Sequence, residues 1–169
     1  QPQKGLVNLL KIFADAHKQR SDFRLIIVGE GPEEERLKSL VNSLGLNSSV
    51  TLAGYQSNTL KYFEKAKATM LTSVYEGFPN VLVESIAAGT PVISFNCPSG
   101  PDDIIEPGIN GILVPNQNLK AFTEAILSVA NNNIQFSKQK IIKTSKKFSV
   151  EVVVDKYEQI IKNLQSNAN

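Results

Sequence analysis

The 169-residue chain has few of the residues that metal and thiol chemistry needs. It contains one cysteine, one histidine, one methionine and no tryptophan. Cys97 cannot close an internal disulfide, which is compatible with a reducing compartment, and no histidine lies near it in sequence to activate it as a nucleophile. His17 has no second histidine or cysteine at metal-ligand spacing, so we expect it to be structural.

Charge of one sign and long apolar runs are also scarce. The formal net charge is +2, and the longest blocks of like charge are residues 33–35 and 146–147. A nucleic-acid surface is therefore not indicated. No apolar run approaches the roughly 20 residues of a membrane span, and no signal peptide is visible. We expect a cytoplasmic protein. A solvated helix face explains the lysines of 138–147 better than contact with an anionic membrane does. Peripheral membrane contact is the alternative for these lysines in a full-length protein.

The chain does have a regular alternation of short apolar runs and helical patterns. Strand-like runs occupy 23–29, 49–54, 68–73, 91–95 and 111–115, and helical patterns occupy 6–17, 33–46, 58–66, 80–89, 119–132 and the last forty residues. The strand-like runs lack in/out alternation, which is typical of parallel strands buried on both faces. The pattern predicts one α/β domain over residues 1–169, a Rossmann-like doubly wound parallel sheet with C-terminal helices.

Such sheets bind ligands at the carboxyl ends of their strands, and the richest loop there is SVYEGFPNVLVE, residues 73–84. Asn80 is a predicted N-cap, so Val81, Leu82 and Val83 would form the first helical turn. Their free N–H groups suit a diphosphate. Gly77 removes a side chain where the backbone must turn or a ligand must approach.

Two glutamates flank this turn. Glu84 would lie roughly 6 Å further along the helix axis, where a carboxylate suits the hydroxyls of a ribose, and Glu76 could serve a second sugar. Solvated surface glutamates are the alternative. The helix, however, is apolar nearly all round, which predicts that it is buried and that Glu84 has a polar partner. The spacing therefore predicts a nucleotide sugar laid across the helix N-terminus.

The stretch E-G-F-P-N-x-x-x-E, followed by A-A-G-x-P-V-I, resembles the retaining glycosyltransferases of the GT-B fold, family 4, also called glycosyl transferases group 1. Their mark is a Glu-x7-Glu motif, here Glu76 and Glu84. QPQKG, VGEGPEEERL, VTLAGY and GINGILVP match further landmarks of that family's second, donor-binding Rossmann domain. The resemblance covers nearly the whole chain.

The resemblance implies roles for individual residues. Glu76 would touch the hydroxyls of the donor sugar and Lys4 would neutralise the diphosphate, which makes these two the expected catalytic residues. Glu84 would bind the ribose. Asp102 and Asp103 could suggest a metal, but the start of a short helix explains them better.

The other expected donor-binding residues line the same pocket. Gly77 and Phe78 would shape the sugar site, and the backbone of Asn80, Val81 and Leu82 would face the diphosphate. Gly29, in the loop GEGP, would lie near the nucleotide. A tight turn into the next helix, with a proline at the helix start, explains that loop at least as well.

The implied function is transfer of a sugar, with retention, from a nucleotide-diphosphate sugar to a glycan or lipid-linked acceptor. The expected nucleotide is UDP, and no obligatory metal is implied. The family's arginine partner of Lys4 would precede Gln1, and its N-terminal acceptor domain is absent from these residues. We therefore expect a donor-binding domain cut from a longer enzyme and inactive alone. The alternatives are a GT-B-like epimerase or phosphorylase and a non-catalytic nucleotide-binding or regulatory module.

Overall fold

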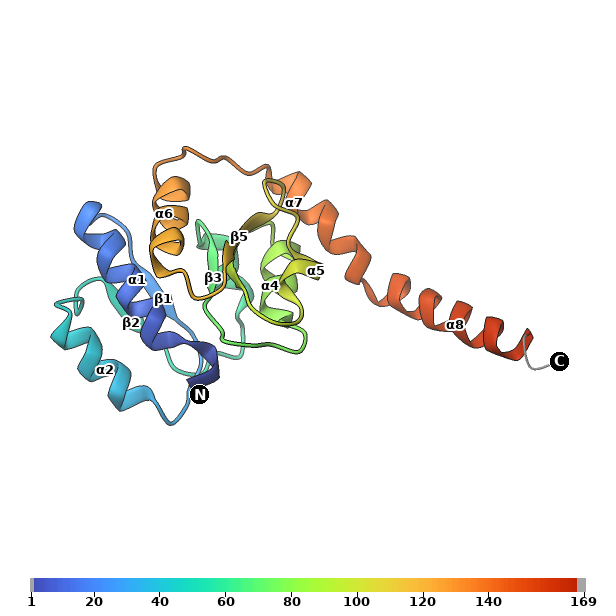
Figure 1. Ribbon diagram of the computed structural model, residues 1–169, viewed down its shortest axis with the longest axis horizontal. Coiled ribbons are helices and arrows are strands. Elements are labelled where there is room, and N and C mark those ends of the chain that lie inside the picture. The colour runs from blue at the N-terminus through green and yellow to red at the C-terminus, as the bar shows by residue number, and fades with distance from the viewer. Residues whose placement is uncertain (1, 167–169) are drawn as a thin grey trace.

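The computed structural model describes residues 2–166, in which parallel strands are surrounded by helices (Figure 1). The strands are β1 (Leu25–Ile27), β2 (Val50–Leu52), β3 (Thr69–Leu71), β4 (Val92–Asn96) and β5 (Gly111–Pro115). The helices between them are α1 (Leu6–Gln19), α2 (Glu34–Ser43), α3 (Leu60–Lys65), α4 (Asn80–Ala87), α5 (Pro101–Ile104) and α6 (Leu119–Ala130). The 3-10 turn η1 (Pro2–Lys4) precedes them, and α7 (Lys138–Ser145), the 3-10 turn η2 (Lys146–Phe148) and α8 (Val150–Ser166) follow.

All strand pairs are parallel, as the alternation of strands and helices predicts. β1 pairs with β2, aligning Leu25 with Val50, and β4 pairs with both β3 and β5. Parallel neighbours need a crossover connection, and helices provide these connections here. The predicted α/β, Rossmann-like architecture is confirmed. The pairing falls into two groups, a two-stranded and a three-stranded sheet.

Burial differs between the two sheets. In β4 the four residues from Val92 to Phe95 are all buried, and the ring of Phe95 packs edge-on against Phe122 of α6 with centroids 4.9 Å apart. In β1, however, Ile26 is 50% exposed and aligns with the exposed Thr51 of β2. The prediction of strands buried on both faces is therefore wrong for this pair. A run of β-branched residues reports strand propensity, and does not by itself show which face is covered.

The first helix is held to its surroundings by polar groups near its C-terminal end. His17 has its Nε2 3.0 Å from the hydroxyl of Ser49 and its ring stacked on Phe13. Arg20 pairs with Asp22 at 2.7 Å and also donates to the carbonyl of Ala130 at the end of α6. This hydrogen-bonded guanidinium lowers the pKa of the Asp22 carboxyl to about 2.

The C-terminal part contains a loop that the sequence prediction missed. Residues 131–137 form no helix, and Asn132 adopts a φ of 57°, so the prediction that the last forty residues are helical is wrong there. Asn110, fully buried, anchors α7 by donating to the hydroxyl of Thr144 at 2.9 Å and to the carbonyl of Ile104 at 3.1 Å. The α6–α7 connection is thus irregular, while α7 is fixed.

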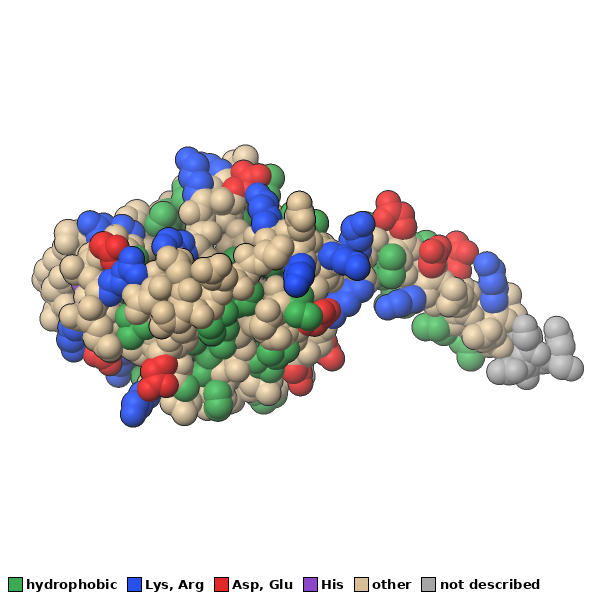
Figure 2. Space-filling model, turned by 90° about the horizontal axis from the view of Figure 1, so that it is seen from above, with side chains coloured by type: hydrophobic (Ala, Val, Ile, Leu, Met, Phe, Trp, Pro, Cys, Tyr) green, Lys and Arg blue, Asp and Glu red, His purple; other side chains and the backbone are tan. Residues whose placement is uncertain are grey.

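The last helix, α8, projects from the body of the molecule (Figures 1 and 2). Its apolar residues recur at helical spacing and lie exposed: Val150, Val153, Val154, Tyr157, Ile160, Ile161 and Leu164. The helical pattern predicted for 150–164 is confirmed, and its apolar face lies exposed in the part of the chain that the structure describes. None of the helices described in residues 2–166 is both long enough and apolar enough to cross a membrane.

Candidate functional site

The candidate site lies where β3 ends, at the carboxyl edge of the three-stranded sheet. Thr72 and Ser73 follow the strand and are buried, and Glu76 comes three residues later. The Glu76 side chain is only 7% exposed. Its Oε1 accepts a hydrogen bond of 2.6 Å from the Ser73 hydroxyl and forms an ion pair of 2.8 Å with the ammonium of Lys4. The structure therefore joins the two expected catalytic residues directly.

A close approach of two backbones places Lys4 beside Glu76. Gly5 has a φ of 64°, and a Cβ built on it would lie 2.0 Å from the carbonyl oxygen of Thr72. The Thr72 hydroxyl donates to the carbonyls of Lys4 and Gly5 at 3.1 and 3.2 Å, and the N–H of Val74 donates to the carbonyl of Gln3 at 2.8 Å. Only glycine fits at position 5, and this fit attaches η1 to the loop after β3.

A second glycine supports the turn from the other side. Gly100, with a φ of 98°, lies so close that a Cβ there would be 2.5 Å from the ring of Pro79 and 3.0 Å from the carbonyl oxygen of Gly77. The N–H of Glu76 donates to the carbonyl of Pro98 at 3.3 Å. The loops that follow β3 and β4 thus pack on each other, and Gly77 itself has open space around it.

The start of α4 differs from the prediction. Asn80 is the first residue of the helix, Pro79 takes the N-cap position, and no side chain caps the helix. The N–H of Asn80 donates to the carbonyl of Phe78 at 3.0 Å, and that of Leu82 donates to the carbonyl of Pro79 at 2.9 Å. The expectation of a free Leu82 donor is therefore wrong. Among the described residues, none accepts a hydrogen bond from the N–H of Val81, nor from those of Gly77 and Phe78.

Glu84 is exposed, one turn into α4. Its carboxylate makes no hydrogen bond or ion pair with any residue in 2–166, so the prediction of a buried helix with a polar partner for Glu84 is wrong. The helix buries one side, with Leu82 and Ile86 fully enclosed, and leaves Ala87 exposed. Alanine occurs on both buried and exposed faces of helices. The number of apolar residues in α4 therefore overestimates how much of the helix is buried. The carboxylate is open to a ligand.

The remaining predicted residue, Gly29, lies after β1. Its N–H donates to the carbonyl of Gly54 at 2.8 Å, and its φ of 123° favours glycine, although no atom lies within 4 Å of a Cβ built there. Its conformation thus serves the turn. Asp102 and Asp103 lie in the short helix α5, as expected. The described residues contain no group of three or more His, Cys, Asp or Glu side chains that could hold a metal ion.

The sequence analysis did not identify several residues of the site. The hydroxyl of Ser73 on Glu76 could have been inferred from the separation of three residues. Gly5 and Gly100 could not, because their importance depends on the residues that pack on them from elsewhere in the chain. The same holds for Phe148, whose ring packs edge-on against Phe78 with centroids 5.7 Å apart.

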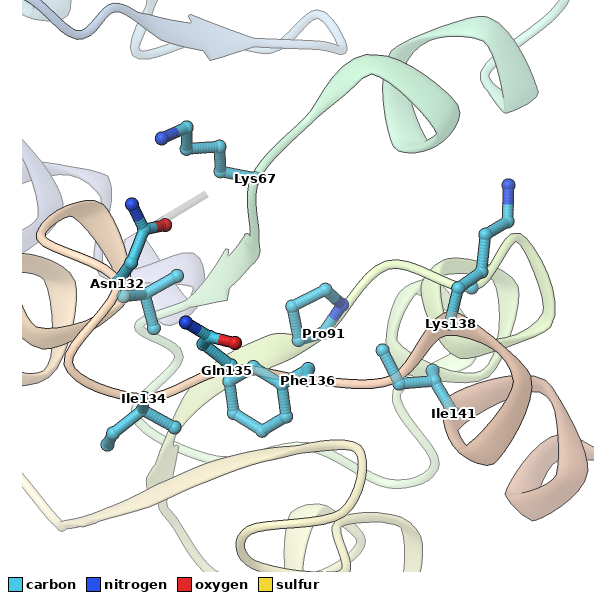
Figure 3. Close-up of a pocket in the computed structure, with 10 residues that line it drawn as sticks. Lys67, Pro91, Asn132, Ile134, Gln135, Phe136, Lys138 and Ile141 are labelled. Atoms are coloured by element: carbon cyan, nitrogen blue, oxygen red, sulfur yellow. The ribbon is translucent and has the colours of Figure 1, made fainter.

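A hollow of about 310 Å³ lies elsewhere (Figure 3). Pro91 and Phe136 form part of its lining, and Lys67 and Lys138 also border it. Because Lys67 lies two residues before β3 and Pro91 lies directly before β4, the hollow is at the amino ends of these strands. Ligands of open α/β sheets bind at the carboxyl ends, so the hollow is separate from the candidate site.

Comparison with known proteins identifies the family to which the chain belongs. The family model for glycosyl transferases group 1 matches residues 1–148. The chain is 33% identical over 168 residues, 98% of its length, to an exopolysaccharide phosphotransferase from Streptomyces coelicolor, covering 18% of that protein. It is 29% identical over 149 residues, 86% of its length, to a lipopolysaccharide 1,6-galactosyltransferase from Salmonella typhimurium, covering 42% of it.

Solved structures show the same likeness. The apo form of the lipopolysaccharide outer core galactosyltransferase WaaB matches with a TM-score of 0.85 and 27% identity over 95% of this chain and 45% of that one. A variant of TarM from S. aureus, in complex with UDP among other ligands, matches with a TM-score of 0.78 and 26% identity over 98% of this chain and 33% of that one. The chain belongs to the group 1 glycosyl transferases, and it spans less than half of each relative named here.

Proposed function

We propose that this chain is the donor-binding domain of a retaining glycosyltransferase that uses a UDP-sugar. The observation that carries the proposal is the arrangement around the turn at 77–79. A carboxylate paired with Lys4 stands before the turn. One helical turn after it stands a carboxylate that has no partner within residues 2–166, and between the two lie N–H groups that likewise have no acceptor in this range. The UDP found in the TarM complex supports the choice of nucleotide.

Each group has a part in this proposal. Glu84 accepts hydrogen bonds from the ribose hydroxyls, as acidic residues do in dinucleotide-binding folds. The N–H groups of Gly77, Phe78 and Val81 face the diphosphate. Lys4, whose side chain is 45% exposed, can reach the same phosphates and stabilise the charge that develops as the diphosphate leaves. The Glu76 carboxylate accepts hydrogen bonds from the hydroxyls of the donor sugar.

The acceptor side of the reaction belongs to another part of the proposed enzyme. The N-terminal domain of the family would bind a glycan or lipid-linked acceptor, and closure of the two domains would align donor and acceptor. The uncovered apolar face of α8 supports contact with a further surface, because large exposed apolar patches mark interaction sites. We propose a cytoplasmic enzyme, with any membrane contact peripheral. The residues described here are expected to bind nucleotide weakly and to transfer nothing alone.

The decisive experiment is an NMR titration of the labelled chain with UDP and with its 2′,3′-dideoxy analogue. Shifts should concentrate on residues 77–84. Glu84→Gln should weaken UDP binding by about tenfold or more, because a hydrogen bond to a charged group contributes about 1.5–3 kcal/mol. Binding of the dideoxy analogue should change much less, since it lacks the hydroxyls.

Glu124→Gln is the matched control, because Glu124 is another exposed helix glutamate and lies far along the chain, in α6. It should bind both nucleotides as the wild type does. Equal losses for both nucleotides in Glu84→Gln would overturn the ribose assignment. No shift at several millimolar UDP would remove the proposed donor site, and sugar transfer by this chain alone would show that the acceptor machinery has been misplaced.

A further inference from the structure

Phe78 ties the turn of the candidate site to a distant part of the chain. Its side chain is 50% exposed, although it lies between Glu76 and the start of α4. One side of its ring meets Phe148, with centroids 5.7 Å apart and ring planes at 65°. Phe148 is the last residue of η2, and α8 begins two residues later.

Phe148 is held in place by other contacts. It packs against the apolar cluster that contains Leu82 and Ile86 of α4. The ammonium of its neighbour Lys147 lies 5.0 Å from the centre of the Phe148 ring and donates to the carboxylate of Glu106 at 3.1 Å. Phe148 is therefore the fixed member of the aromatic pair, and Phe78 is the member that belongs to an exposed loop.

The backbone around Phe78 carries the groups that would meet a diphosphate. The N–H groups of Gly77 and Phe78 have no acceptor among the described residues, and the carbonyl of Phe78 accepts from the N–H of Asn80. If the Phe78 ring lost its support, the turn could rotate and these N–H groups would change direction. The close approach of Gly100 is to Pro79 and to the carbonyl oxygen of Gly77, on either side of Phe78.

We propose that Phe148 is a positioning residue for the donor site. By holding the ring of Phe78 it fixes the turn at 77–79, so that the N–H groups there point at the second phosphate of a nucleoside diphosphate. This role rests on the proposed function. It assigns to the segment before α8 a part in donor binding, although Phe148 lies 64 residues beyond Glu84, the end of the Glu-x7-Glu motif.

The test compares UDP with UMP, because the two nucleotides differ by the second phosphate alone. Phe148→Ala should lower UDP affinity about tenfold and leave UMP affinity within about twofold, so the preference for UDP over UMP falls. Phe148→Tyr keeps an aromatic ring and should keep the preference. Amide shifts of Gly77 and Phe78 should move in unliganded Phe148→Ala.

Phe136→Ala is the matched control. Phe136 packs against the same apolar cluster but lines the hollow at the opposite edge of the sheet. Phe136→Ala should lower the free energy of unfolding about as much as Phe148→Ala does, and it should keep the preference for UDP over UMP. An unchanged preference in Phe148→Ala, or an equal loss for both nucleotides, would overturn the positioning role alone. A wild-type chain that binds neither nucleotide would overturn the proposed function, and this role with it.

Discussion

Replacing Gly5 with alanine tests the contact that brings Lys4 to Glu76. Two effects add. An L-residue at a φ of 64° costs about 1–2 kcal/mol. The new methyl group would also lie 2.0 Å from the Thr72 carbonyl oxygen, so the two backbones must separate by more than 1 Å to reach ordinary contact at 3.4 Å or beyond.

That separation weakens or breaks the hydrogen bonds that attach η1 to the loop after β3. They run from the Thr72 hydroxyl to the carbonyls of Lys4 and Gly5, and from the N–H of Val74 to the carbonyl of Gln3. The Thr72 hydroxyl has one hydrogen, which the two carbonyls share, so it counts as one hydrogen bond and the Val74 N–H as a second, and each contributes about 0.5–1.5 kcal/mol net. Together with the conformational cost, Gly5→Ala should lower the free energy of unfolding by about 2–5 kcal/mol, measured by urea denaturation followed by far-UV circular dichroism.

Gly45→Ala separates the two effects. Gly45 has a φ of 69°, almost that of Gly5, but no atom lies within 4 Å of a Cβ built there. It should therefore lose about 1–2 kcal/mol, from the backbone conformation alone. Under the proposed function Gly5→Ala should also weaken UDP binding, because Lys4 is displaced, while Gly45→Ala should not. Equal destabilisation by the two substitutions would refute the close packing of Gly5 on Thr72.

Two further predictions concern charged groups. Under the proposed function, Glu76→Ala in the whole enzyme should lower turnover and leave UDP affinity nearly intact, because the carboxylate would bind the sugar and not the nucleotide; collapse of UDP binding in calorimetry would make Glu76 a nucleotide-binding or structural residue. The Asp22 carboxylate should stabilise the fold fully above pH 4 and lose that effect as the pH falls toward 2, because Arg20 lowers its folded pKa from 3.8 to about 2. Asp22→Asn should therefore show a shallower loss of unfolding free energy over this range than the wild type or than Asp155→Asn on exposed α8, and identical profiles would contradict the pairing.

The sequence predicts the fold well where local pattern and burial agree. β4, buried from Val92 to Phe95, and the amphipathic α1 and α6 were expected from their apolar residues, and they occur within a few residues of the predicted ranges. The prediction of burial fails at Ile26 in β1, where one face of an apolar strand lies exposed. Hydrophobic periodicity shows which residues share one face of a helix or strand, but it does not show whether another element packs on that face.

The site likewise contains residues that local sequence suggests and contacts that only tertiary packing reveals. Local spacing selects Glu76 and Glu84 as candidates, Lys4 follows from the family resemblance alone, and the roles of all three stay predictions. The fit of Gly5 on Thr72 could not be predicted, since it depends on two backbones 67 residues apart. The Phe78–Phe148 contact is likewise a product of tertiary packing.

The ion pair between Lys4 and Glu76 links a buried carboxylate to a half-exposed ammonium. Glu76 is 7% exposed, and a carboxylate so enclosed needs a partner, which Lys4 and Ser73 provide. Lys4, at 45% exposure, is half in solvent, where an ion pair contributes about 1 kcal/mol or less. Under the proposed function, a diphosphate could therefore draw the ammonium away at small cost while the Ser73 hydrogen bond keeps Glu76 oriented. The carboxylate freed in this way would accept hydrogen bonds from the sugar hydroxyls, so phosphate and sugar binding would favour each other at one residue pair.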